Sequence, residues 1–233
     1  NVLGERVDVE LVTKISERTE NWPAGLRLAC LALRDQEDIS LFLEGFHGSN
    51  QQVMSYLLDE LLVQQPPTIY DFLLRTAVLD RFCAPLCDAL NKCVADLENT
   101  ISSQEIIESL IEANLFTFGL DQQGQWFRYH HLFQELLIHK LKAKVSITEI
   151  AALHTAAAMW LDENGFIEEA IDHALGANDM VLVAQLVEKH RHEMMNQEQW
   201  LRLRRWLNRL PQQLIEQRVP LLLIKAWHLG IYF

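Results

Sequence analysis

The stretch LFTFGLDQQGQWFRYHHLFQELL, residues 115–137, decides the fold class because the hydrophobic period changes within it. LFTFGL and QWFRYH are short, aromatic-rich segments with strand character, and DQQG between them supplies the Asp and Gly of a tight turn. From His131 onward, HLFQELLIHKLKAK resumes helical spacing and ends in lysines, which suit a helix C-terminus. The stretch therefore predicts a β-hairpin followed by a helix.

Helical spacing is visible in the segments that precede this hairpin, at 50–64, 69–79, 84–93 and 104–114. Ser49 or Asn50 can cap the first of them, and Ser102 or Ser103 can cap the last. The last three of these segments, the hairpin and the helix after it have the order of a winged-helix domain: three helices, a hairpin and a further helix. We place this domain at residues 49–146.

Short helices with alanines at close-contact positions follow from Thr148. The helix that begins there ends at Gly165, a suitable C′ residue, and further helical segments follow it directly. The candidate contact positions, which would let paired helices approach closely, are Ala156, Ala170, Ala174 and Ala184. Although no strict 34-residue period is visible, antiparallel helix pairs of this length resemble tetratricopeptide-type repeats. We place such an arm at residues 147–233.

Residues 1–48 also have helical spacing, interrupted by NWP at 21–23. The predicted fold is therefore mainly α: a helical segment at 1–48, a winged-helix domain with one β-hairpin, and tetratricopeptide-like antiparallel helix pairs. The chain also stops in the apolar residues LLLIKAWHLGIYF, so we expect a piece of a longer protein.

Charge argues against a nucleic-acid surface. The net charge is −12, and residues 51–145 carry seven basic against twelve acidic side chains. The helix before the hairpin would be the recognition helix, and it carries Glu105, Glu108 and Glu112 but no Lys or Arg. Carboxylates facing a phosphate-lined groove are repelled, so we expect no direct DNA contact by this chain.

Membrane and secreted classes are not favoured either. No apolar run approaches the roughly 18 to 20 residues that a membrane span needs, and the first residues, NVLGERVDVE, have no apolar h-region. The four cysteines, Cys30, Cys83, Cys87 and Cys93, form no disulfide framework and no paired zinc motif. We expect a cytoplasmic protein in which Cys83 and Cys87 are small buried residues.

The adjacent histidines His130 and His131 are the candidates for a functional site, and four interpretations are open. They can satisfy local backbone groups, bind a metal, act in catalysis or sense a phosphate. Because neighbouring residues of a strand point to opposite faces, we expect them not to share one metal ion. No Ser, Cys or Asp partner stands in an identifiable catalytic elbow. Composition does not separate the structural interpretation from phosphate sensing.

Four segments in order resemble the large MalT-like, LuxR-type ATP-dependent transcriptional regulators, which belong to the signal-transduction ATPases with numerous domains. The segments are ERTENWPAGLRLACLAL (17–33), FLLRTAVLDRFCAPLCDAL (72–90), ANLFTFGLDQQGQWFRYHHLFQELL (113–137) and ALHTAAAMWLDENGFIEEAIDHALGANDM (152–180). The third is the most specific, and the resemblance extends over nearly the whole chain.

The resemblance implies a P-loop ATPase core, a small helical lid, a winged helix, a helical-repeat sensor arm and a C-terminal helix-turn-helix. Residues 1–48 would be a lid segment of the ATPase module. In such regulators, inducer and ATP switch a resting, ADP-bound monomer into an oligomer that activates transcription. The implied cofactor of the full-length protein is ADP or ATP with magnesium, and none is expected for this chain alone.

The resemblance also assigns two residues of a partial nucleotide pocket. NWP is similar to the Gly-x-Pro motif of the lid, which would place Pro23 near the adenine, although Asn21 replaces the glycine. YHH is similar to the Met-His-Asp motif of related switch ATPases, which would make His130 the phosphate-contacting histidine. His131 replaces the aspartate, so only His130 and Pro23 are carried over.

The departures from the family pattern limit what the chain does by itself. No G-x-x-x-x-G-K-[ST] motif occurs, and no terminal helix-turn-helix is present. We expect no enzyme activity from this chain, whereas the whole protein would be a weak regulatory ATPase. The expected partners are the rest of its own chain, with the P-loop core and helix-turn-helix, and a small-molecule or protein effector on the arm. No catalytic or metal residue is assigned.

A freestanding helical-repeat interaction module is the alternative function. The alanine-rich helix pairs and Trp160, Trp200, Trp206 and Trp227 support it, because a concave repeat surface with aromatic side chains can hold a peptide or protein. A metal-dependent hydrolase that uses the nine histidines is a third hypothesis.

Overall fold

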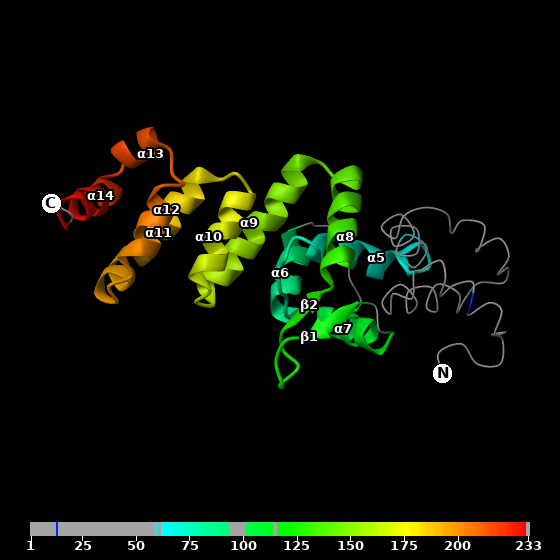
Figure 1. Ribbon diagram of the computed structural model, residues 1–233. Helices are drawn as coiled ribbons and strands as arrows, with labels where there is room; N and C mark the ends of the chain where they lie inside the picture. Colours follow the sequence, from blue (N-terminus) through cyan, green and yellow to red (C-terminus); the bar gives the residue numbers. More distant parts are fainter. Residues whose placement is uncertain (1–12, 14–58, 60–61, 94–100, 114–115, 232–233) are drawn as a thin grey trace. The chain divides into compact units, whose positions relative to one another are not determined.

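The computed structural model describes residues 13, 59, 62–93, 101–113 and 116–231 (Figure 1). The predicted lid segment, apart from Thr13, and Pro23 lie outside the described residues. The described residues group into two compact units, and each is described by itself. One holds the described residues up to Leu74 together with His130–Leu137, and the other holds Arg75–Tyr129 and the chain from Ile138 onward.

In the described chain from Pro67 onward, α5 (Pro67–Thr76), α6 (Ala84–Cys93) and α7 (Ser103–Glu112) precede the hairpin. A capping box starts α7. The Ser102 hydroxyl accepts a hydrogen bond from the Glu105 amide, and the Glu105 carboxylate accepts one from the Ser102 amide. The predicted helices are confirmed over the described residues.

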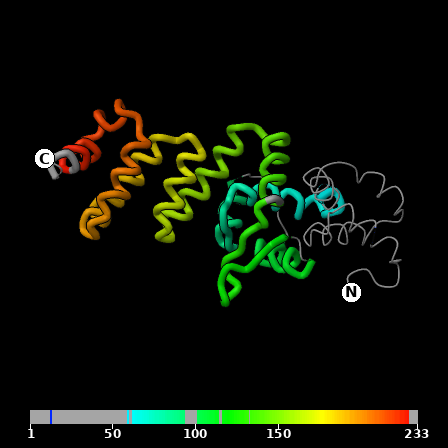
Figure 2. Tube along the Cα trace, viewed as in Figure 1, coloured from blue at the N-terminus to red at the C-terminus, as the bar shows by residue number. Residues whose placement is uncertain are grey.

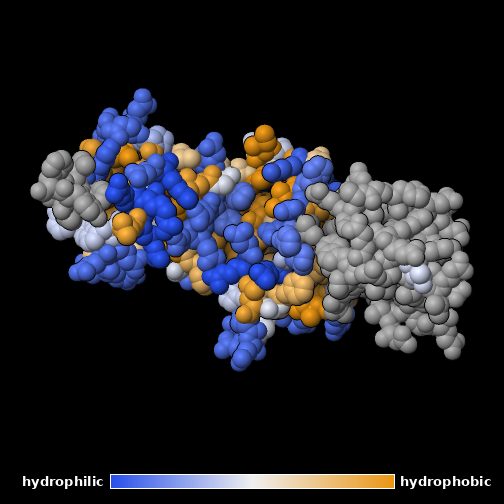
Figure 3. Space-filling model, viewed as in Figure 1, coloured by the Kyte–Doolittle hydropathy of each residue, from blue (hydrophilic) through white to orange (hydrophobic). Residues whose placement is uncertain are grey.

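The hairpin consists of β1 (Thr117–Gly119) and β2 (Phe127–Tyr129), which pair antiparallel with Thr117 opposite Tyr129. The Asp121 carboxylate accepts hydrogen bonds from the amides of Gln125 and Trp126, which close the turn. Both strands are shorter than the predicted segments: a single backbone hydrogen bond, from the Leu120 amide to the Trp126 carbonyl, separates them from the turn, and β2 ends where the chain passes into α8. The turn forms a hydrophilic tip in Figure 3.

One isolated bridge extends this small sheet. Phe82 and Phe127 exchange two backbone hydrogen bonds of 2.8 Å, so the segment before α6 lies along β2. The Phe82 ring packs on the ring of Tyr129 at a centroid distance of 4.6 Å. The hydroxyl of Tyr129 is in turn hydrogen-bonded to Thr76 Oγ1 at 2.7 Å, and both residues are buried. The hairpin is therefore held to Thr76 and to Phe82, in the segment before α6, by buried contacts.

The helix after the hairpin is α8 (His131–Lys144), with the predicted bounds. The arm then follows as a series of helices, joined by short connections (Figures 1 and 2). These are α9 (Ile147–Glu163), α10 (Ile167–Gly176), α11 (Met180–Asn196), α12 (Trp200–Leu207), α13 (Gln212–Glu216) and α14 (Val219–Ile231).

The helices α9, α10, α11 and α12 pack in succession, α13 and α14 pack on each other and on α11, and α9 also packs on α6 of the winged helix. The predicted contact alanines are buried: Ala156, Ala170, Ala174 and Ala184. Small side chains at these positions allow close approach of the helix axes, so the predicted helix pairs are confirmed. Trp206 is buried as well, so it belongs to the core and offers no binding surface, contrary to its use in the interaction-module hypothesis.

Three consecutive arm helices end in the same way. The C′ residues of α9, α10 and α11 are left-handed, and each terminus closes with a hydrogen bond from the next amide to a carbonyl five residues back. The left-handed residues are Gly165 (φ 83°), Asn178 (φ 56°) and Glu198 (φ 56°). Only the glycine was predicted, because asparagine and glutamate carry no comparable signal. Within the described residues, no helix is long and apolar enough to cross a membrane.

Candidate functional site

His130 directly follows β2 and is half-buried. Its carbonyl accepts a 2.9 Å hydrogen bond from the amide of Gln134, so His130 occupies the position just before the first turn of α8. His131 begins α8, as predicted, and is exposed. Pro23 lies outside the described residues, so a pocket formed by Pro23 and His130 stays a prediction.

The two histidine rings lie close together, with centroids 4.4 Å apart and planes tilted by 30°. The expectation that they point to opposite faces is therefore wrong. The strand ends at Tyr129 and the helix begins at His131, so the backbone turns between the two histidines and the alternation of a strand does not apply. In the described part of the chain, no three His, Cys, Asp or Glu side chains gather as a metal site would require.

Cys83 and Cys87 are buried, as predicted. Burial raises the pKa of the Cys83 thiol and raises that of Cys87 well above its ordinary value. The reactive thiolate is therefore disfavoured at both positions. These thiols pack as small apolar groups.

A second cluster joins the winged helix to the arm through Arg81. Its guanidinium donates to both carboxylate oxygens of Glu169 in α10, from Nε at 3.0 Å and from Nη2 at 2.6 Å. Such a two-bond geometry fixes the guanidinium in the plane of the carboxylate. The hydrogen bond with Glu169 raises the pKa of Arg81, while partial burial acts in the opposite direction.

Aromatic rings surround the same guanidinium. Arg81 Cζ lies 4.3 Å from the ring centroid of Trp126 and 4.9 Å from that of Phe166. Trp126 meets Phe166 edge-on at 5.1 Å, and Phe166 is stacked against Trp160 at 6.4 Å. The guanidinium of Arg81, in the segment before α6, therefore contacts the hairpin and the start of α10. Trp160 of α9 lies behind Phe166. We call Arg81, Trp126, Trp160, Phe166 and Glu169 the Arg81 joint.

The Arg81 joint was not predicted from the sequence. Arg81 and Glu169 are 88 residues apart, and no local pattern marks either of them. The only available signal was an aromatic residue at the end of the turn, Trp126, and two more around the turn after α9, Trp160 and Phe166. Aromatic residues at such positions are ordinarily read as core.

Further acidic residues of α10 hold the next helix of the arm. The Glu168 carboxylate oxygens lie 2.8 Å from Arg205 Nη2 and 3.5 Å from Arg202 Nη2, both in α12. Asp172 Oδ1 lies 2.7 Å from Nη1 of Arg209, just after α12. These pairs are largely exposed, so each contributes little to stability by itself. Together with Glu169, they make α10 the helix that links the winged helix to α12.

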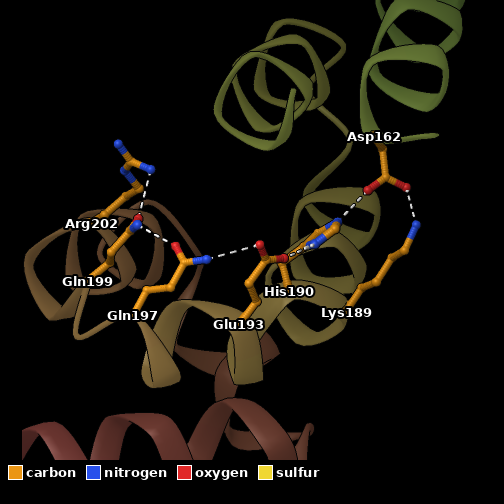
Figure 4. A network of polar contacts seen from close by, with 7 residues as sticks. All are labelled: Asp162, Lys189, His190, Glu193, Gln197, Gln199 and Arg202. Atoms are coloured by element: carbon orange, nitrogen blue, oxygen red, sulfur yellow. Dashed lines mark hydrogen bonds and ion pairs between the residues drawn. The ribbon is translucent and has the colours of Figure 1, made fainter. Parts of the chain in front are cut away.

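A polar network ties α9 to α11 (Figure 4). Asp162 of α9 is hydrogen-bonded to Lys189 at 2.7 Å and to His190 at 2.5 Å, and the chain of contacts continues through Glu193 toward α12. Burial opposes ionisation of Asp162, but the hydrogen bonds from Lys189 and His190 outweigh it and lower the pKa of this carboxyl. The Asp162 side chain is only 12% exposed, so its charge is well shielded from solvent.

Comparison with known proteins agrees with this architecture. Residues 58–148 match the family model of the MalT winged helix domain. The chain is 32% identical over 222 residues to "Serine/threonine-protein kinase PknK" of Mycobacterium tuberculosis (strain ATCC 25618 / H37Rv), covering 95% of this chain and 19% of that protein.

Other relatives are named as transcriptional regulators. The "HTH-type transcriptional regulator MalT" of Vibrio parahaemolyticus is 27% identical over 227 residues, covering 97% of this chain and 24% of that protein. The protein of the same name from Yersinia enterocolitica is 30% identical over 219 residues, covering 92% and 23%. The chain spans about a fifth to a quarter of the length of the curated relatives it matches. The chain is therefore MalT-like along nearly its whole length, with a MalT winged-helix domain at residues 58–148.

Proposed function

We propose that this chain is the regulatory middle part of an ATP-dependent transcriptional regulator, in which it couples the ADP or ATP state to effector binding and oligomerisation. The observation that carries the proposal is a MalT winged-helix domain whose hairpin leads directly into the half-buried His130. The names of two relatives supply the transcriptional role. By itself the chain would be no enzyme.

In this proposal, His130 and Pro23 form part of a nucleotide pocket that a P-loop core of the same protein completes. The His130 imidazole would donate a hydrogen bond to a phosphate, as a histidine beside an anionic ligand does. A group that contacts only one nucleotide state favours the conformation that holds this state, so it shifts the balance between two conformations. Magnesium would accompany the nucleotide in the full-length protein.

The other partners follow from the same proposal. An effector, either a small molecule or a protein, would bind the helical arm. The helix α7 presents Glu105, Glu108 and Glu112 as exposed carboxylates, so it is unsuited to DNA. Exposed carboxylates on this helix disfavour its entry into a groove lined by phosphates. A C-terminal helix-turn-helix of the full-length protein would contact DNA instead.

Calorimetric titration of the full-length protein with ADP tests the proposal. His130→Ala should weaken ADP binding roughly tenfold or more, since a hydrogen bond to a charged group contributes about 1.5–3 kcal/mol. His131→Ala is the matched control, because His131 is adjacent but exposed, and it should leave the affinity unchanged. An unchanged ADP affinity in His130→Ala would contradict the proposal.

A freestanding helical-repeat interaction module remains the second candidate function, and one observation favours it. An apolar stripe at helical spacing is exposed on α14, formed by Val219, Leu222, Leu223 and Trp227. Trp227 also stacks on Trp200 of α12, with ring centroids 5.4 Å apart. The length of the native gene discriminates the two candidates: a P-loop encoded upstream favours the regulator, and a stop directly after Phe233 favours the module.

A further inference from the structure

The Arg81 joint combines two kinds of contact that restrain different motions. The two hydrogen bonds to Glu169 restrain sliding and rotation in the plane of the guanidinium. The faces of Trp126 and Phe166 restrain movement out of that plane. A joint of this geometry holds hairpin and arm in one relative position, which a single exposed ion pair would not do.

On the arm side, ion pairs and hydrogen bonds connect the elements of the joint to further helices. Glu169 lies on α10, the helix whose neighbouring acids Glu168 and Asp172 are paired with arginines in and just after α12. Phe166 lies in the connection between α9 and α10, and Asp162 in the last turns of α9 is fixed to α11. A displacement of α11 or α12 would therefore act on the elements that carry Phe166 and Glu169, the two arm residues that contact Arg81.

On the hairpin side, hydrogen bonds likewise hold the segments next to the joint. Phe82, next to Arg81, exchanges two backbone hydrogen bonds with Phe127 of β2. Tyr129, at the end of the same strand, is anchored by its buried hydrogen bond to Thr76. The chain then passes directly to His130, where it enters the other compact unit.

We propose that the Arg81 joint is a mechanical lock that transmits displacements of the arm to the hairpin, and through β2 to His130. Arg81 is thus a positioning residue: it acts through Trp126 and Glu169 and contacts no nucleotide. The part of this inference that concerns His130 rests on the proposed function. The lock between arm and hairpin does not, and it can be tested in this chain without nucleotide or effector.

Hydrogen exchange in the 233-residue chain measures the transmission. The reporters are the amides of Leu120 and Phe127, which are hydrogen-bonded to Trp126 and Phe82. Two arm substitutions supply the disturbance. Asp162→Asn weakens the link between α9 and α11, and Gly176→Ala places a Cβ 2.8 Å from the His154 ring.

Each disturbance should speed exchange of the hairpin amides several-fold, on the order of three- to tenfold, when Arg81 is present. In an Arg81→Met background the same disturbances should change hairpin exchange less than twofold, although α9–α11 amides still respond. Arg205→Met is the matched control, because it removes another arginine partner of α10 without touching the joint. In that background the hairpin response should persist.

Two results would overturn the lock. One is an equal hairpin response with and without Arg81. The other is no hairpin response in the parent chain to either disturbance while the arm amides exchange faster. The test also separates the lock from the proposed function: a full-length protein that does not bind ADP refutes the nucleotide role, whereas loss of transmission in Arg81→Met still establishes the lock.

Discussion

Arg81 and Glu169, 88 residues apart in the chain, share two hydrogen bonds that connect the winged helix to the arm. The charges sit at side chains that are 33% and 37% exposed, and the guanidinium is also covered by two aromatic rings. This partial shielding distinguishes the pair from the more exposed pairs between α10 and α12. A substitution of Arg81 should therefore cost more stability than one at those pairs.

Arg81→Lys should destabilise the chain by about 1 kcal/mol, although the charge is retained. A lysine ammonium offers no planar fork for two parallel hydrogen bonds and stacks poorly on Trp126. Urea unfolding measures the change. Arg205→Lys at an exposed pair is the control and should change the free energy of unfolding by less than about 0.5 kcal/mol; equal losses in both variants would mean that the joint has no special stability.

His154 and His173 give a prediction for pH. Their Nδ1 atoms lie 2.9 Å apart between α9 and α10. Burial, followed by the nearby His154, lowers the pKa of His173 to about 4, and burial also lowers the pKa of His154, against the charge of Asp80. The unfolded chain therefore takes up protons at a higher pH than the folded chain.

The free energy of unfolding should accordingly be highest above about pH 6.5. It should fall by about 2–3 kcal/mol as the pH drops from there toward 4. His173→Gln removes the main titrating group and should flatten this dependence, as measured by urea unfolding at several pH values. His192→Gln, at an exposed histidine, should leave it unchanged. A wild-type curve that is flat between pH 6.5 and 4 contradicts the assignment.

Glu198 is a non-glycine residue in the left-handed region, at φ 56°. Glu198→Gly should stabilise the chain by about 0.5–1 kcal/mol, because glycine adopts this conformation without the steric cost of a Cβ. Gly165→Ala, at φ 83° in the matching turn after α9, should destabilise it by a similar amount. Thermal unfolding of the two variants checks the opposite signs.

The buried hydrogen bond between Tyr129 and Thr76 anchors the end of β2. Tyr129→Phe and Thr76→Val should each cost about 1 kcal/mol, and the double variant should cost less than the sum. A double-mutant cycle by chemical denaturation provides the coupling free energy. Strict additivity would show that the two hydroxyl groups do not stabilise each other.

Local patterns predicted most of the architecture. The change from alternating to helical spacing located the hairpin and placed α8 at His131–Lys144, and Gly165 marked the end of α9. These features depend on neighbouring residues alone, through backbone conformation and side-chain period. The left-handed Asn178 and Glu198 carried no such mark, because neither residue requires that conformation.

The joint and the histidine pairs could not be predicted in the same way. Arg81 and Glu169 meet only because α6 packs on α9 and α10 packs on α9, and these contacts are set by the whole core. The predicted strand segment ran to His130, whereas β2 ends at Tyr129, and the rings of His130 and His131 lie close together and do not point to opposite faces. Where a strand passes into a helix, the direction of side chains depends on the geometry of the junction and not on the sequence period.

We propose that the bound nucleotide acts on the winged helix at His130, and hydrogen exchange of the full-length protein with and without ADP tests this most directly. We predict that ADP slows exchange of the amides from Phe127 to Gln134, and that His130→Ala abolishes this protection while His131→Ala preserves it. If ADP binds but leaves exchange in this segment unchanged, or if the protection persists in His130→Ala, the account is contradicted.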